Sequence, residues 1–139
     1  MSEHFKMGHR FTLGKDQRLK SRKRIERIFR EGKSINVFPY RVYYMLGDGY
    51  APGGAAYALQ AGFGASSRHF KKAVDRNRIK RLTREAYRLN KGGLGQVVEQ
   101  RKLHLSLFFI YTGKELPDHR LVSGKIAVAL EKIVKEIGS

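Results

Sequence analysis

The stretch KKAVDRNRIKRLTREAYRLNK, residues 71–91, carries nine Lys or Arg side chains and two acidic ones. Its apolar residues recur at spacings of three to five, which places them on one side of a helix: Val74, Ile79, Leu82, Ala86 and Leu89. Four cations stand at successive i, i+4 positions: Arg76, Lys80, Arg84 and Arg88. Like charges at this spacing destabilise an isolated helix by about 0.2–0.5 kcal/mol per pair. The row therefore predicts an anionic partner such as phosphate.

The start of this basic helix is less regular than its middle. Asn77 is unfavourable inside a helix, because its amide competes for backbone hydrogen bonds. One solution is that the helix begins near Asp75, with Asp75 as the N-cap. Arg76 and Arg78 would then lie at the positive end of the helix dipole, where a docked phosphate would turn repulsion into attraction. Whether or not the helix begins at Asp75, the basic residues of this segment favour binding of an anion to the helix.

The positive charge of the chain is concentrated in two segments. Of 139 residues with a formal net charge of +17, residues 15–33 hold nine basic and three acidic side chains, and residues 71–91 hold nine and two. These two segments therefore account for most of the excess. Charge focused in this way predicts binding to nucleic acid or to an anionic membrane surface.

Several classes of protein are disfavoured by composition. The chain has no Cys, which excludes disulfides and Cys-based metal sites. No apolar run approaches the roughly 18–20 residues that a transmembrane helix needs. The first 15 residues lack the apolar core of a secretory signal. We therefore expect a cytoplasmic protein with no membrane partner.

An arm and a short helix are expected ahead of the rest of the fold. Residues 1–17 show little periodicity and predict a loose basic arm before a single domain at 18–139. Ser21 can cap a helix that runs to about Glu31 and stops at Gly32. The apolar stripe of this helix is narrow and consists of Ile25, Ile28 and Phe29, with Leu19 just ahead.

Three strands and a last helix complete the prediction. Aromatic and β-branched residues indicate a strand at 40–46 and a second at 57–63, antiparallel to the first across the Gly/Pro-rich loop 47–56. Gly92-Gly93 is expected to end the basic helix. Residues 103–111 become continuously apolar, which predicts a central strand. A final helix starts at Pro117-Asp118 and has one apolar face: Val122, Ile126, Ala129, Leu130, Ile133 and Ile137.

The predicted order is helix, strand, strand, helix, strand, helix. This order favours an α+β fold, an α/β sandwich in which helices pack on a small mixed sheet. The last helix belongs to the core, whereas the cationic side of the basic helix remains available to a partner.

Three segments resemble the bacterial ribonuclease P protein subunit. VDRNRIKRLTREAYRLNK at 74–91 is similar to the Arg-Asn-Arg motif of that family. RLKSRKRIERIFREGKS at 18–34 resembles its N-terminal helix with a Phe-x-x-Gly-x-Ser ending. AGFGASSRHFKKAV at 61–74 resembles the strand and loop that lead into the motif. The similarity covers roughly residues 15–137.

The resemblance implies a left-handed βαβ crossover, where the sequence pattern alone would favour a right-handed one. It also implies a subunit of an endoribonuclease that removes the 5′ leader of precursor tRNA, with the catalytic centre on an RNA molecule. The protein would bind no cofactor and no small-molecule substrate itself, while the holoenzyme would require Mg²⁺. Its partners would be the catalytic RNA and precursor tRNA.

Site residues follow from the same resemblance. Residues expected to bind the catalytic RNA are Arg68, Lys71, Lys72, Arg76, Asn77, Arg78, Lys80, Arg81, Arg84 and Arg88. Ile25, Phe29 and a strand aromatic would line a cleft for the leader. Because a strand shows alternate faces, Tyr40, Tyr43 and Tyr44 cannot all line one cleft, and our expectation is Tyr44.

The chain departs from the family pattern in two places. An aromatic residue often stands at the position of Ile25, so one stacking surface is weaker here. The loop at 64–67 is Gly-Ala-Ser-Ser rather than Lys-rich, which leaves Arg68 and His69 as its basic residues. These departures bear on the leader more than on the catalytic RNA.

Other functions fit the sequence less well or share only part of its pattern. The five His residues are scattered, and Asp75 and Glu85 lack an acidic neighbour that could help to hold Mg²⁺, so a protein-borne nuclease centre is not indicated. A structural RNA-binding protein of a ribosome-like particle would have the same charge and no role in cleavage. A DNA-binding helix-turn-helix would need a helix directly before the basic one, where the sequence predicts a strand. A membrane-surface helix would need bulky aromatics opposite its charges.

Overall fold

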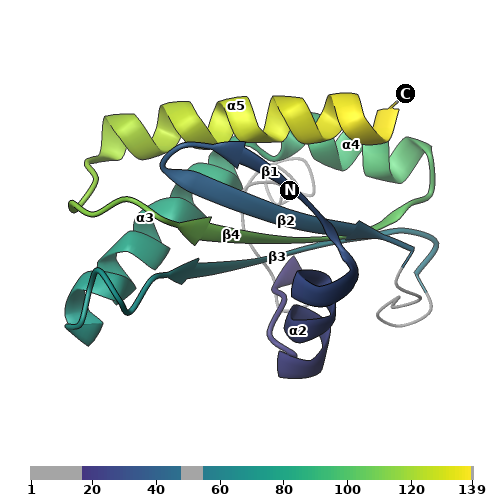
Figure 1. Ribbon diagram of the computed structural model, residues 1–139. Helices are drawn as coiled ribbons and strands as arrows, with labels where there is room; N and C mark the ends of the chain where they lie inside the picture. Colours follow the sequence, from purple (N-terminus) through teal and green to yellow (C-terminus); the bar gives the residue numbers. More distant parts are fainter. Residues whose placement is uncertain (1–16, 48–54, 139) are drawn as a thin grey trace, which may run out of the picture.

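The structure, a computed structural model, describes residues 17–47 and 55–138. The expected arm, apart from Gln17, and most of the loop at 47–56 lie outside these ranges. Figure 1 shows helices on both sides of one sheet. The elements in chain order are α2 (Arg22–Glu31), β1 (Lys33–Val37), β2 (Tyr40–Leu46), β3 (Ala58–Ala65), α3 (Ala73–Asn90), α4 (Gly92–Gln100), β4 (His104–Tyr111) and α5 (His119–Gly138).

The sheet has the strand order β1-β2-β4-β3. β2 pairs antiparallel with both β1 and β4, whereas β3 and β4 are parallel. The predicted central position of β4 is confirmed, since Leu105, Leu107 and Phe109 are all buried. The two strands on either side of loop 47–56 are antiparallel as predicted, but they are not neighbours in the sheet. β4 lies between β2 and β3, because its apolar run gains most burial in the middle of the sheet.

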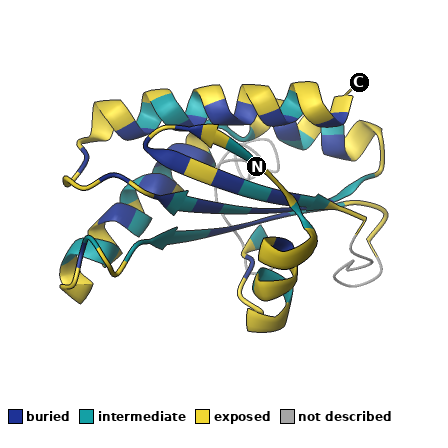
Figure 2. Ribbon diagram, viewed as in Figure 1, coloured by how far each residue is buried: buried dark blue, intermediate teal, exposed yellow. Residues whose placement is uncertain are grey.

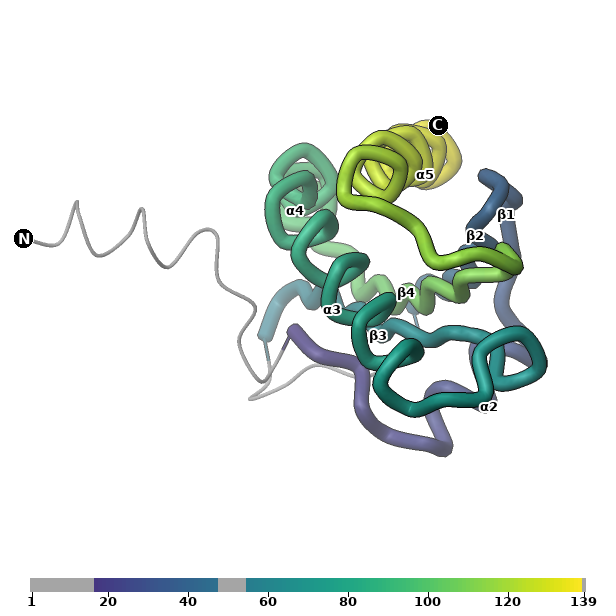
Figure 3. Tube along the Cα trace, turned by 90° about the vertical axis from the view of Figure 1, so that its left-hand side faces the viewer, coloured from purple at the N-terminus to yellow at the C-terminus, as the bar shows by residue number. Residues whose placement is uncertain are grey.

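The connection between the parallel strands β3 and β4 runs through α3 and α4. Both helices pack against β3 and against α5, so they lie on the α5 side of the sheet. Followed from β3 to β4 in Figures 1 and 3, this crossover is left-handed. The handedness implied by the resemblance is therefore found, and the general preference for right-handed crossovers is overridden here.

Two elements are absent from the prediction. β1 is short and polar, with only Val37 buried, so neither its length nor its pattern indicates a strand. α4 begins at Gly92, two residues after α3 ends at Asn90. The glycines thus end one helix as expected but also begin another, which buries Leu94 and Val98 one turn apart. That apolar pair was the available signal for α4.

The core lies between α5, α3, α4 and one face of the sheet. All six residues of the apolar face predicted for α5 are buried. The N-terminus of α5 is capped by Asp118, whose Oδ1 accepts a hydrogen bond from the Leu121 backbone N–H at 2.8 Å. Figure 2 shows the buried stripe facing the sheet. Each Leu or Ile buried in this way contributes about 1.5–3 kcal/mol to folding.

The buried face of α3 is rotated from the predicted one. It consists of Ile79, Thr83, Ala86 and Tyr87, whereas Val74 and Leu89 are 67% and 50% exposed. Thr83 can be buried because its hydroxyl donates to the Ile79 carbonyl at 2.8 Å and accepts from the Tyr40 hydroxyl at 2.7 Å. Hydropathy alone does not reveal a polar residue whose partners come from another element.

α2 packs on the opposite face of the sheet from α5 (Figures 1 and 3). It begins as predicted, with Ser21 as N-cap and its Oγ accepting from the Arg24 backbone N–H at 3.4 Å. Ile28 is fully buried beneath it. Gly32 ends α2 for a reason of space, because a Cβ atom there would lie 2.6 Å from the Ile28 oxygen and 2.7 Å from the Tyr44 oxygen.

We expect Gly32→Ala to lower the free energy of unfolding by about 1–3 kcal/mol, because two backbone carbonyls cannot both move away from the added methyl group. Gly124→Ala is the matched control. Nothing lies within 4 Å of a Cβ atom at Gly124, which is inside α5. There the change should raise stability by up to about 1 kcal/mol through helix propensity. Urea denaturation of both variants checks the result, and equal effects of the two would contradict it.

Candidate RNA-binding surface

α3 begins three residues earlier than an N-cap at Asp75 would require. Its first residue is Ala73, Lys72 is at the N-cap position, and Asp75 lies in the first turn, where its charge suits the helix dipole. The Arg76 guanidinium is directed back along the chain, and its Nη1 donates to the Phe70 and Lys71 carbonyls at 2.8 and 2.9 Å. Arg76 therefore fixes the loop ahead of α3.

The exposed cations of α3 form a stripe different from the predicted row. Arg78, Arg81 and Arg84 follow one another at i, i+3 and are all exposed. Lys71 and Lys72 are exposed just before the helix. We call these five residues the α3 cationic face.

The other α3 residues expected to bind RNA are placed differently. Asn77 is exposed, whereas Arg76 and Lys80 are partly buried. Arg88 forms an ion pair with Glu85, and hydrogen bonding from Arg88 is the main cause that lowers the pKa of the Glu85 carboxyl. An ion pair thus relieves repulsion at the C-terminal end of α3, whereas no carboxylate among the described residues forms an ion pair with the α3 cationic face.

On the α2 side of the sheet, residues form successive rows across the strands. One row runs through Ser34, Tyr43, Phe108 and Gly62. The next, nearer the end of β3 that leads towards α3, runs through Asn36, Arg41, Ile110 and Gly64. Alternation along each strand places these side chains opposite the core.

Three aromatic rings meet above the first of these rows. Phe29 of α2 lies edge-to-face with Tyr43 at 4.9 Å between ring centroids and with Phe108 at 5.2 Å. Phe29 is 41% exposed, and the two strand aromatics are partly exposed. β3 contributes a glycine here because a Cβ atom at Gly62 would lie 2.7 Å from the Phe108 ring. We call Phe29, Tyr43 and Phe108 the aromatic cluster.

The expectation that Tyr44 lines the cleft is wrong. Tyr44 is buried on the α5 side of the sheet, and its hydroxyl donates to Glu136 Oε1 at 3.0 Å. Burial raises the pKa of the Tyr44 phenol. The residue on the α2 side is Tyr43, because register fixes which alternate residues of β2 face the core. Ile25 and Phe29 do lie on α2, with Ile25 partly buried.

A polar cluster that the sequence did not reveal attaches α2 to the sheet. Gln60 and Ser106 lie in β3 and β4 and are each only 2% exposed. The Arg24 guanidinium donates to Gln60 Oε1 and, at 2.6 Å, to Ser106 Oγ. Since both strands read as apolar, only their pairing shows that Gln60 and Ser106 are opposite each other.

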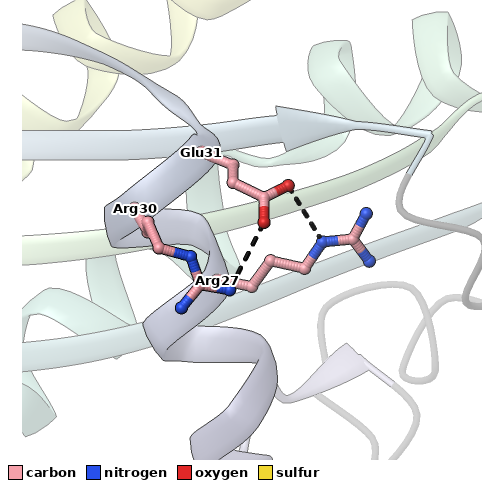
Figure 4. Close-up of polar contacts among 3 residues, drawn as sticks. All are labelled: Arg27, Arg30 and Glu31. Atoms are coloured by element: carbon pink, nitrogen blue, oxygen red, sulfur yellow. Dashed lines mark hydrogen bonds and ion pairs between the residues drawn. The ribbon is translucent and has the colours of Figure 1, made fainter.

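On the outer surface of α2, two arginines form ion pairs with the same carboxylate. Arg27 Nε lies 3.3 Å from Glu31 Oε1, and Arg30 Nη2 lies 3.3 Å from Glu31 Oε2. Figure 4 draws both contacts. Hydrogen bonds from Arg27, which has the larger effect, and from Arg30 lower the pKa of the Glu31 carboxyl. All three side chains are exposed, so the arrangement orders the end of α2 without adding much stability.

Residues 17–47 and 55–138 hold no group of three or more His, Asp or Glu side chains that could bind a metal ion. No helix in this part of the chain is long and apolar enough to cross a membrane.

Proteins of known family are similar to this chain over most of its length. Two relatives are ribonuclease P protein components. That of Porphyromonas gingivalis ATCC 33277 is 40% identical over 129 residues, covering 93% of this chain and 91% of the relative. That of Chlorobium phaeobacteroides is 29% identical over 132 residues, covering 90% of each.

Solved structures show the same fold. The Staphylococcus aureus RNase P protein matches with a TM-score of 0.65 at 21% identity, over 87% of this chain and 97% of its own. A mutant of the S. aureus protein, described as defective in mRNA degradation activity, matches with a TM-score of 0.59 at 21% identity, over 97% and 96%. The predicted α+β class is thus confirmed. Residues 13–133 match the Ribonuclease P family, and this chain belongs to that family as a protein component of ribonuclease P.

Proposed function

We propose that this ribonuclease P protein binds the catalytic RNA through the α3 cationic face, and the 5′ leader of precursor tRNA on the α2 side of the sheet. The observation that carries the proposal is the placement of these two surfaces. The aromatic cluster lies on the α2 side near the middle of the sheet, and from its row β3 continues through Gly64 and Ala65 into the loop that leads to α3.

The α3 cationic face suits a folded RNA. Its members are exposed, and no carboxylate among the described residues forms an ion pair with Arg78, Arg81 or Arg84. When exposed cationic side chains bind phosphates, the counterions that had condensed on the RNA are released. This release is the main source of affinity for a polyanion. The cost of placing like charges along one helix is then offset in the complex.

The aromatic cluster suits an unpaired strand. Exposed rings stack on single-stranded bases at roughly 1–3 kcal/mol per base without requiring a particular sequence. Duplex RNA offers no base face to such rings, whereas a leader does. The departure at Ile25 leaves Phe29 as the aromatic residue of α2, so in this chain the cluster draws its other two rings from the strands.

In this proposal the RNA carries the catalytic centre and Mg²⁺ for hydrolysis of one phosphodiester bond. The protein neutralises charge and positions the substrate, and it acts in the cytoplasm. Two RNA molecules repel each other, and divalent cations would otherwise screen this repulsion. The positive charge of the protein takes over part of that screening.

Reconstitution tests this role. Cleavage of a precursor tRNA is measured with RNA alone, protein alone and both, over a series of Mg²⁺ concentrations. We expect no cleavage by the protein alone and faster cleavage by the pair than by RNA alone, with the largest gain at low Mg²⁺. An equal rate with and without protein at every Mg²⁺ concentration would leave only a structural role in RNA binding.

A further inference from the structure

Arg41 lies beside the aromatic cluster on the α2 side of the sheet. Its guanidinium carbon is 5.9 Å from the centroid of the Tyr43 ring. Its Nε donates to Asn36 Oδ1 at 3.2 Å. Asn36 is the cross-strand partner of Arg41, so both side chains project from the same face of the sheet. The contact with the ring and the hydrogen bond together hold an exposed guanidinium in one place.

The position of Arg41 is as informative as its contacts. In the row that contains it, Ile110 is the next residue on β4 and Gly64 the next on β3, and both are partly exposed. This row follows the aromatic cluster in the direction of the loop that leads to α3. A strand of RNA that leaves the cluster in that direction meets Arg41 next.

The chemistry of Arg41 indicates a phosphate. Asn36 is a neutral acceptor and uses only the Nε–H, so the two Nη groups keep the fork that matches a phosphodiester. Arg41 forms no ion pair with a carboxylate among the described residues. A cation held beside an aromatic ring and left without a counter-ion fits a nucleotide, whose base and phosphate are adjacent.

We propose that Arg41 is a substrate-positioning residue that binds the leader phosphate next to the base stacked on Tyr43. This inference rests on the proposed leader site. It places a second contact with phosphate on the α2 side of the sheet, separate from the α3 cationic face. It also gives Asn36 a role, which is to set the direction of the guanidinium.

The test is binding of precursor tRNA, with and without a leader, to the reconstituted holoenzyme over a salt series. Arg41→Gln should weaken binding of the leader-containing RNA about tenfold near 0.1 M salt and flatten its log–log salt slope by about 0.7, the value for one phosphate contact on a single strand. Binding of the leaderless RNA should not change. Asn36→Ala should cause a smaller loss with the slope unchanged, since the charge remains.

Arg120→Gln is the matched control, because it removes an exposed arginine at the start of α5, on the other side of the sheet. It should leave the difference between the two RNAs intact. If Arg41→Gln binds the leader-containing RNA with wild-type affinity and slope, the inference about Arg41 is overturned while the leader site stands. If the wild-type holoenzyme binds both RNAs equally, the leader site itself is wrong and Arg41 loses its assigned ligand.

Discussion

Replacing Arg78, Arg81 and Arg84 together with Gln is expected to weaken binding to the catalytic RNA by on the order of 10³-fold or more. A hydrogen bond to a charged group contributes about 1.5–3 kcal/mol, and three such contacts would be lost. The log–log salt slope should become flatter by about 2–3, since each phosphate contact contributes about 0.7–0.9. Filter binding over a salt series measures both quantities.

A second triple variant separates local contacts from net charge. Lys114, Arg120 and Lys132 are exposed in and before α5, which packs against α3. Replacing them with Gln removes the same charge without altering the α3 cationic face. We expect this variant to change affinity only slightly, through the overall field. Equal losses in the two triple variants would show that α3 has no special role.

Arg76 is left out of the triple variant on purpose. Because its guanidinium bonds to the Phe70 and Lys71 carbonyls, its replacement would disturb the loop ahead of α3 as well as any contact with RNA. Within the described residues, the side chains of Arg78, Arg81 and Arg84 form no such hydrogen bond to the backbone, so their replacement reports on binding.

The second large effect is expected from the aromatic cluster. Replacing both Phe29 and Tyr43 with Leu should reduce the affinity of the holoenzyme for leader-containing precursor tRNA by roughly 10²-fold or more, because two stacking surfaces at about 1–3 kcal/mol each are lost. Leaderless tRNA should bind as before. The salt slope should not change, which distinguishes this loss from that of Arg41→Gln.

The neighbouring residue supplies the control. Tyr44→Phe removes a hydroxyl on the opposite face of the sheet and should cost about 0.5–1.5 kcal/mol of stability through its hydrogen bond to Glu136. It should leave leader binding unchanged. If Tyr44→Phe weakened leader binding and the double Leu variant did not, the assignment of faces on β2 would be reversed.

Local sequence patterns predicted most of the helices and strands. They did not predict which side chains are buried where the packing partners are distant in sequence. The face of α5 could be predicted because six apolar residues at helical spacing leave one way to bury them. The face of α3 could not, because Thr83 is buried only with the help of Tyr40, which is 43 residues away in sequence. For the same reason Arg24, Gln60 and Ser106 could not be recognised as a group before the strands were paired.

The sequence by itself determined the class of partner, the α+β fold and the helix that carries the charge. These depend on composition and on periodicity within single segments. The tertiary structure alone decided that Tyr43 rather than Tyr44 faces α2, that the exposed cations run through Arg78, Arg81 and Arg84, and that Arg41 adjoins the aromatic cluster. The physical reason is that a side chain's face depends on register and helix rotation, which are set by what packs against the element and not by the element itself.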